Sequence, residues 1–183
     1  LANIDFSSGD FPIEKLSNAI IRSSMIDYAI WSYKEERSKL EAAPISAWFC
    51  ADVSVAEATL NAIEKSGFEA AIVTAKTPIK ERMKLLALHE DGEIEAIVSV
   101  GVLAEGWDNP NCNIIVHLRP TLSKVLWGQS VGRGLRSAPG KESCVVIDVS
   151  SNWSTFGPVE KLEWSLWSHR KSYMQFMLSL IHI

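Results

Sequence analysis

Short apolar runs alternate with longer segments of helical period along most of the chain. The runs predicted as strands are residues 45–50, 69–73, 94–98, 113–118 and 143–149. Most of them are continuously apolar, as strands are when a parallel sheet is covered on both faces. Strands that alternate with helices form βαβ units. The pattern therefore predicts an α/β fold with a parallel sheet flanked by helices.

Three helices are predicted between these strands, and charged helical sequence precedes them in residues 12–41. The first runs over residues 54–66 and ends at Gly67, a residue that favours a helix C-terminus. The second opens with Thr77 as its N-cap and Pro78 at the first helical position. Its predicted buried side is Met83, Leu85, Leu86 and Leu88. The third runs over residues 123–132.

The composition fits one compact domain. The chain has 183 residues, of which 47% are hydrophobic and 22% charged, and two full domains do not fit this length. The formal net charge of −4 excludes a uniformly basic nucleic-acid binder. The charge is uneven, however, with −6 before Ile97 and +2 from Ile97 onward. Anionic partners are therefore expected at the second half of the chain.

Cysteine usage and hydropathy indicate the compartment. Cys50, Cys112 and Cys144 have no short mutual spacing, which favours a reducing compartment over disulfides or a zinc site. The four histidines also lack metal-ligand spacing, so each is expected to be hydrogen-bonded or exposed. No segment approaches the roughly 20 apolar residues of a membrane span, and no signal peptide is recognisable. We expect a soluble cytoplasmic protein with no membrane partner and no metal site of its own.

The densest candidate for chemistry lies at the end of the third predicted helix, from Gln129 to Arg136. Arg133 and Arg136 are three residues apart and so point to the same side of a helix. Gly132 and Gly134 let a ligand or another backbone approach closely. Paired guanidinium groups suit phosphate oxygens, which they bind bidentately. The alternative for an isolated pair of this kind is a set of surface salt bridges.

A second candidate follows the third predicted strand, in residues 99–110. Loops at the carboxyl ends of parallel strands are where open α/β sheets bind ligands. Gly106 permits a tight turn, Asp108 can accept a hydrogen bond from a ribose hydroxyl, and Pro110 stops a helix. The alternative for residues 108–110 is a plain turn.

Together, in this order and about 25 residues apart, the two segments resemble motifs V and VI of superfamily 2 helicases. Residues 47–50 followed by 54–58 resemble motif IV, and residues 74–77 stand where the family has a loop that touches the nucleic-acid backbone. Residues 119–124 and 140–141 resemble RadD-type and phage DEAD/DEAH-box DNA helicases more than DEAD-box RNA helicases.

The resemblance covers residues 45–150 and implies a second RecA-like domain, which closes over ATP held by a first one. It implies arginine fingers at Arg133 and Arg136, with Gln129 as a supporting polar contact on the catalytic side. The implied ATP-binding residues are Gly106, Asp108 and Gly132. The implied nucleic-acid contacts are Phe49, Ala51, Thr74, Ser99, Val100 and Gly101.

The chain departs from a complete motor in ways that define its expected role. It has no P-loop, because Glu142 follows Gly140-Lys141 where a P-loop has Ser or Thr. Asp148 is followed by Val149 rather than by Glu, so it is interpreted as a structural strand end. Relatives often have Arg or Thr where Glu105 stands. ATP and Mg²⁺ are therefore expected to be held mainly by an N-terminal RecA-like domain, and the isolated chain is expected to be inactive.

The resulting hypothesis divides the chain into three parts. Residues 1–43 are a helical lead-in from a first RecA-like domain, 44–150 form the helicase C-terminal RecA-like domain, and 151–183 are a Trp-rich, truncated extension. The expected partners are DNA, bound through its phosphates, and the N-terminal RecA-like domain of the same protein. Two alternatives remain: the motor of a restriction or excision-repair complex, and a non-catalytic RecA-like module for protein interaction.

Overall fold

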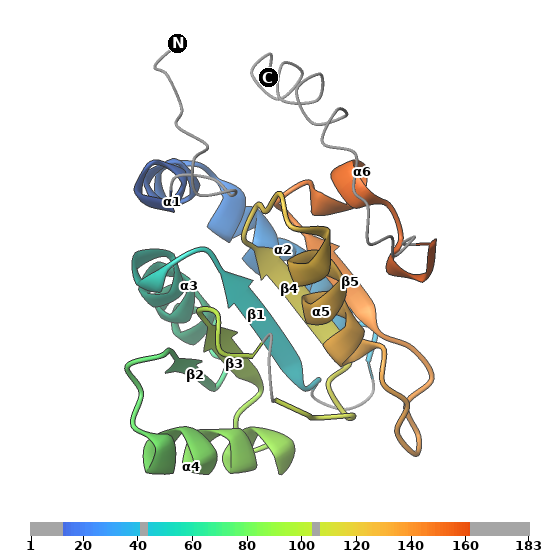
Figure 1. The fold of residues 1–183 in the computed structure, drawn as a ribbon. Coiled ribbons are helices and arrows are strands. Elements are labelled where there is room, and N and C mark those ends of the chain that lie inside the picture. The colour runs from blue at the N-terminus through green and yellow to red at the C-terminus, as the bar shows by residue number, and fades with distance from the viewer. Residues whose placement is uncertain (1–12, 41–43, 104–106, 162–183) are drawn as a thin grey trace.

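The computed structural model describes residues 13–40, 44–103 and 107–161 (Figure 1). Five strands in these residues form one sheet in the order β2-β3-β1-β4-β5, and every pairing is parallel. The strands are β1 (Ser46–Cys50), β2 (Ala70–Val73), β3 (Ala96–Ser99), β4 (Ile114–Leu118) and β5 (Val145–Asp148). All five predicted strands are present with small shifts at their ends, so the predicted fold class is confirmed.

Helices cover both faces of the sheet (Figure 1). One face carries α1 (Ile13–Arg22), α2 (Met25–Arg37) and α3 (Val53–Lys65). The other face carries α4 (Ile79–Glu90) and α5 (Lys124–Gly134). The short helix α6 (Asn152–Phe156) and the 3-10 helix η1 (Val159–Lys161) follow β5. The part of the chain that the structure describes contains no helix long and apolar enough to cross a membrane.

The core is divided by the sheet, because successive strand residues point to opposite faces. Trp48 of β1 packs with α1, α2 and α3, whereas its neighbours Ala47 and Phe49 pack on the side of α4 and the loop that contains Trp107. Both sets of side chains are buried. This two-sided burial is why the strands are apolar at consecutive positions rather than at every second one.

Two of the helices begin with a side-chain cap. Asp52 caps α3 by accepting a hydrogen bond from Val55 N (2.9 Å), and Ser123 caps α5 by accepting one from Leu126 N (3.3 Å). These caps satisfy backbone donors that lack a partner within the helix. Both helices start at the carboxyl edge of the sheet and run back toward its amino edge.

The start and the buried side of α4 differ from the prediction. Pro78, not Thr77, is the N-cap, because the Thr77 hydroxyl accepts a hydrogen bond from Thr74 N (2.9 Å) and so closes the preceding turn. Met83 is 66% exposed, although it was predicted to be buried. The second half of α4 meets the sheet through Leu85, Leu86 and the buried His89, while its first half lies beyond the packed surface.

Candidate functional site

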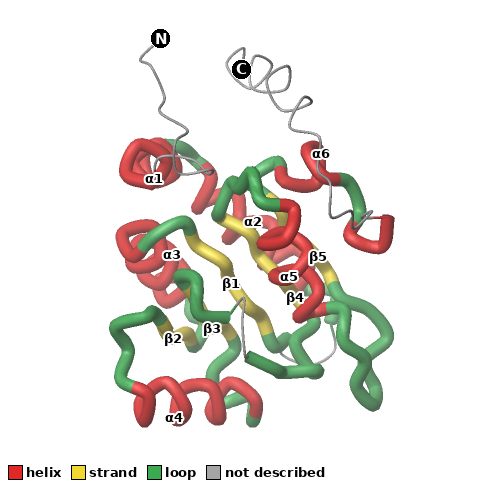
Figure 2. Tube along the Cα trace, in the orientation of Figure 1, coloured by secondary structure: helices red, strands yellow, loops and turns green. Residues whose placement is uncertain are grey.

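The C-terminal end of α5 and the loop at residues 107–110 meet near the amino ends of β4 and β5 (Figure 2). Arg133 Nη1 donates a hydrogen bond to the carbonyl oxygen of Trp107 (2.7 Å). Arg136 forms an ion pair with Asp108. The structure therefore brings together the arginine pair and the carboxylate that the sequence placed in two separate candidate segments.

The packing of α5 sets where the arginines stand. Trp127 and Val131 of α5 are buried on the side of the helix that packs against β5 and the residues after it. At its last residue, Gly134, an added Cβ would lie 2.5 Å from Cys144 Sγ and 2.6 Å from Ile115 Cγ1. Such distances mean that the helix end rests directly on the sheet, where a side chain does not fit. The backbone that carries Arg133 is thereby fixed against β4.

The polar groups at this end of α5 are accessible. The side chains of Arg136 and Asp108 are 42% and 57% exposed, Gln129 is exposed, and Arg133 is half-buried. Gly132 has no atom within 4 Å of the place where a Cβ would stand. Guanidinium groups beside an open stretch of backbone suit the oxygens of a phosphate chain. Gly106, the remaining predicted ATP-binding residue, lies outside the described residues.

The predicted site residues fall at two edges of the sheet. Phe49, Thr74 and residues 99–101 lie at or just beyond the carboxyl ends of β1, β2 and β3. The arginine pair and Asp108 lie near the amino edge, because residues 107–110 precede the amino end of β4 and the end of α5 packs on Ile115. The sequence predicts that residues 99–110 lie together at the carboxyl edge. The structure separates the two ends of this segment.

The nucleic-acid candidates differ in exposure. Phe49 is 5% exposed and stacks on the His117 ring, with ring centroids 5.6 Å apart. Ala51 and Ser99 are also buried, and Ser99 Oγ accepts a hydrogen bond from Leu103 N (3.3 Å). Thr74 and Val100 are half-buried, and Gly101 is exposed. Gly101 has a φ of 74°, a conformation that favours glycine over any other residue.

His117 is a buried link between β4 and α5 that the sequence analysis did not single out. Its Nε2 lies 2.8 Å from Ser130 Oγ, and its Nδ1 lies 3.1 Å from both Arg119 O and Asn152 Nδ2. Burial lowers the pKa of His117 to about 3, so the imidazole is neutral at physiological pH. Ser130 and Asn152 are 13 and 35 residues from His117 in sequence, so no local spacing could have found these two contacts.

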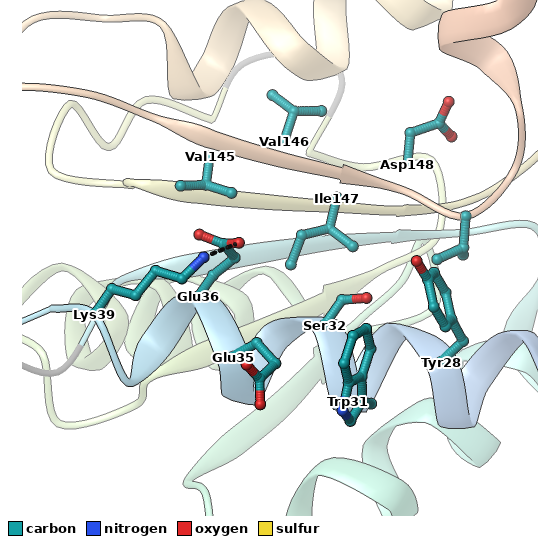
Figure 3. A pocket seen from close by; sticks show the side chains of 11 residues that line it. Tyr28, Trp31, Ser32, Glu35, Glu36, Lys39, Val145, Val146, Ile147 and Asp148 are labelled. Carbon is teal, nitrogen blue, oxygen red and sulfur yellow. Dashed lines mark hydrogen bonds and ion pairs between the residues drawn. The ribbon is translucent and has the colours of Figure 1, made fainter.

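Away from the predicted site residues, the described ranges hold a groove but no cluster of metal-ligating side chains. They contain no group of three or more His, Cys, Asp or Glu residues that could hold a metal ion. A groove of about 410 Å³ lies between α2 and β5 (Figure 3). Tyr28 and Trp31 line it, together with Glu36 and Lys39, which form an ion pair (2.6 Å). None of the sequence-predicted site residues lines this groove.

Comparison with known proteins identifies the family. The profile of the helicase conserved C-terminal domain matches residues 34–138, and this range includes the arginine pair and Asp108. The chain belongs to the helicase C-terminal domain family. The predicted superfamily 2 resemblance is thereby confirmed at the level of the family.

Two relatives illustrate how far the similarity extends. The chain is 27% identical over 150 residues to the putative ATP-dependent helicase IRC3 of Saccharomyces cerevisiae. The matched region covers 81% of the chain and 21% of the yeast protein. It is 26% identical over 157 residues to a 51.5 kDa protein of a Lactococcus phage, and the matched region covers 86% of the chain and 33% of the phage protein. The chain thus spans a third or less of the length of these relatives.

Solved structures share the fold. The C-terminal domain of the DEAD-box protein Dbp5 superposes with a TM-score of 0.56 at 19% identity, covering 73% of this chain and 74% of that one. A fragment of a putative HsdR subunit of a type I restriction enzyme from Vibrio vulnificus gives a TM-score of 0.64 at 22% identity, covering 86% of this chain and 31% of that one. These neighbours establish the RecA-like helicase C-terminal fold.

Proposed function

We propose that the chain is the C-terminal motor domain of an ATP-dependent DNA helicase or translocase. In this role it supplies arginine fingers to an ATP site that it shares with an N-terminal RecA-like domain. The observation that carries the proposal is the accessible guanidinium group of Arg136, which stands beside Arg133 and the open backbone of Gly132. Family membership supplies the context, because helicase C-terminal domains belong to ATP-driven motors.

Each residue at the amino edge has a proposed role. Arg136 and Arg133 neutralise the charge that develops on the transferring γ-phosphoryl group. Gln129 lies one helical turn before Arg133 and adds a polar contact. Asp108 accepts hydrogen bonds from the ribose, and the resemblance to helicases adds Gly106 to the residues that contact ATP. Release of Arg136 from Asp108 accompanies binding, because the phosphate oxygens replace the carboxylate as the partner of the guanidinium group.

The chemistry of ATP cleavage requires groups that this sequence lacks. A P-loop and an Asp-Glu strand end, which hold the phosphates and Mg²⁺, belong to the N-terminal RecA-like domain in this proposal. ATP supplies the phosphoanhydride bond whose hydrolysis drives domain opening. The residues of this chain position the cleaved group and sense its loss, so the isolated chain hydrolyses no ATP.

Nucleic acid is proposed to bind at the opposite edge of the sheet. Thr74, Val100 and Gly101 are accessible there, while the buried side chains of Phe49, Ala51 and Ser99 hold the loops that present backbone groups. A solved relative, Saccharomyces cerevisiae Dbp5 bound to RNA and ADP–BeF₃, superposes with a TM-score of 0.52, so the shared fold is compatible with both kinds of ligand. DNA is proposed here from the resemblance to DNA helicases. Contacts to phosphates predict strong salt dependence and little sequence preference.

The test is nucleic-acid-stimulated ATP hydrolysis by the natural full-length protein. Arg136→Ala is expected to lower kcat by about 10³-fold or more while nucleotide binding is largely kept. Arg22→Ala is the matched control, because Arg22 is exposed in the last turn of α1, and it should leave kcat unchanged. Unchanged turnover in Arg136→Ala, or none in the parent, contradicts the motor and favours the interaction module. Stimulation by RNA but not by DNA contradicts the proposed substrate.

A further inference from the structure

Lys141 binds three backbone carbonyl groups at once. Its Nζ donates to Gly134 O (2.6 Å), Arg136 O (2.8 Å) and Pro110 O (2.9 Å). An ammonium group has three hydrogens and no acceptor, so these three contacts use its whole capacity. Gly134 is the last residue of α5, Arg136 follows just beyond the helix, and Pro110 belongs to the loop that carries Asp108.

The site for this ammonium group is formed by the helix end. The last carbonyl groups of an α-helix have no partner within the helix, and the helix dipole places partial negative charge there. Gly134 O is such a group. The positive charge of Lys141 therefore stabilises the C-terminus of α5, and the half-buried position of its side chain limits competition from water.

A tight turn returns the chain so that Lys141 reaches this position. Lys141 N donates to Ala138 O (3.1 Å) across Pro139 and Gly140, and Gly140 has a φ of 79°. Proline at the second position and a glycine of positive φ at the third are the features of a type II turn. Gly140 and Lys141 are not part of a P-loop. Their structural role is to close this turn and to bring the Lys141 side chain to the end of α5.

We propose that Lys141 is a positioning residue. Its three hydrogen bonds form a clamp that fixes the position of the α5 end relative to the loop at residues 107–110 while Arg133 and Arg136 act on phosphate. Arg133 and Arg136 also join these two segments, through Trp107 O and Asp108. Those links use the guanidinium groups that the proposed reaction needs. Lys141 holds the same segments through backbone carbonyls and leaves the guanidinium groups available for the γ-phosphate.

This inference rests on the proposed function, and its test separates the two. In the full-length protein, Lys141→Met is expected to lower the kcat of ATP hydrolysis by about 10- to 100-fold with a smaller change in KM, because misplacement by about 1 Å has effects of that size. Lys141→Arg keeps the charge but presents a planar fork instead of three convergent donors. Its kcat should lie between those of the parent and Lys141→Met.

The matched control is Lys39→Met, which removes the Lys39–Glu36 ion pair at the C-terminal end of α2 and should leave kcat unchanged. Backbone hydrogen exchange provides a readout that needs no turnover. Lys141→Met should speed exchange at residues 107–113 and 133–137 more than in β1 and β4.

A parent without stimulated hydrolysis contradicts the proposed function, whereas parent-like kcat and exchange in Lys141→Met overturn the clamp. If Lys141→Met does not fold, parent-like kcat in Lys141→Arg overturns it instead.

Discussion

Arg136 and Asp108 form an ion pair in which both side chains remain largely exposed, at 42% and 57%. Exposed ion pairs contribute about 0–1 kcal/mol to folding, because water screens the charges and both side chains lose freedom. This pair is therefore of little importance for the stability of the fold. In the proposed function, the pair keeps the two side chains close together and is displaced when ATP binds.

Asp108→Ala tests this interpretation. We expect the free energy of unfolding to fall by no more than about 1 kcal/mol in urea denaturation of the chain. In the full-length protein the KM for ATP should rise by about tenfold or more, since a hydrogen bond from a ribose hydroxyl to a charged group is lost. Asp91→Ala, in the exposed turn after α4, is the control. A large loss of stability, or an unchanged KM, is incompatible with the proposed role of Asp108.

Gly134 and Gly132 give a matched pair of substitutions two residues apart. Gly134→Ala places a methyl group within 2.6 Å of Cys144 Sγ and Ile115 Cγ1, and overpacking of this kind costs about 1–3 kcal/mol. Gly132→Ala meets no atom within 4 Å, and alanine favours a helix over glycine by about 0.5–1 kcal/mol. Thermal unfolding should therefore show a lower Tm for the first variant and an equal or higher Tm for the second. The reverse order would show that α5 does not rest on the sheet as described.

The stability of the fold should fall below neutral pH because of two buried histidines. Burial lowers the pKa of His117 to about 3 and that of His89 to about 4, whereas an unfolded histidine has a pKa of about 6.5. The unfolded chain therefore binds protons that the folded chain does not, and this favours unfolding. The contribution of each residue is complete above pH of about 6.5 and is lost as the pH falls toward its folded pKa, by up to about 1.4 kcal/mol per pH unit.

Urea unfolding between pH 7.5 and about pH 4.5 measures this effect. His117→Gln removes one titrating group, so its stability should depend less steeply on pH than that of the parent. Because both proteins contain the same carboxylates, the contribution of these groups to the pH dependence cancels in the comparison. Equal slopes would mean that His117 is protonated in the folded chain, contrary to its buried position.

Much of the candidate site could be predicted because its signals are local. The spacing of Arg133 and Arg136 and the glycines around them are visible in eight consecutive residues, and Asp108 follows a recognisable strand. The structure brings these residues together. The exposure of the candidates was not predictable in the same way, since Phe49 and Ser99 lie at strand ends where a loop and a buried position have the same sequence pattern.

Local sequence thus determined the strands, the parallel sheet and the arginine-bearing helix, because hydrophobic period and turn residues act over a few neighbours. The tertiary structure alone decided that residues 99–101 and Asp108 lie at different edges of the sheet, that Gly134 must lack a side chain, and that Lys141 contacts both Gly134 and Pro110. Lys141 and Pro110 are 31 residues apart in sequence. Their contact depends on how α5 packs on β4 and on where the chain returns to the sheet, and no periodic pattern encodes an approach of that kind.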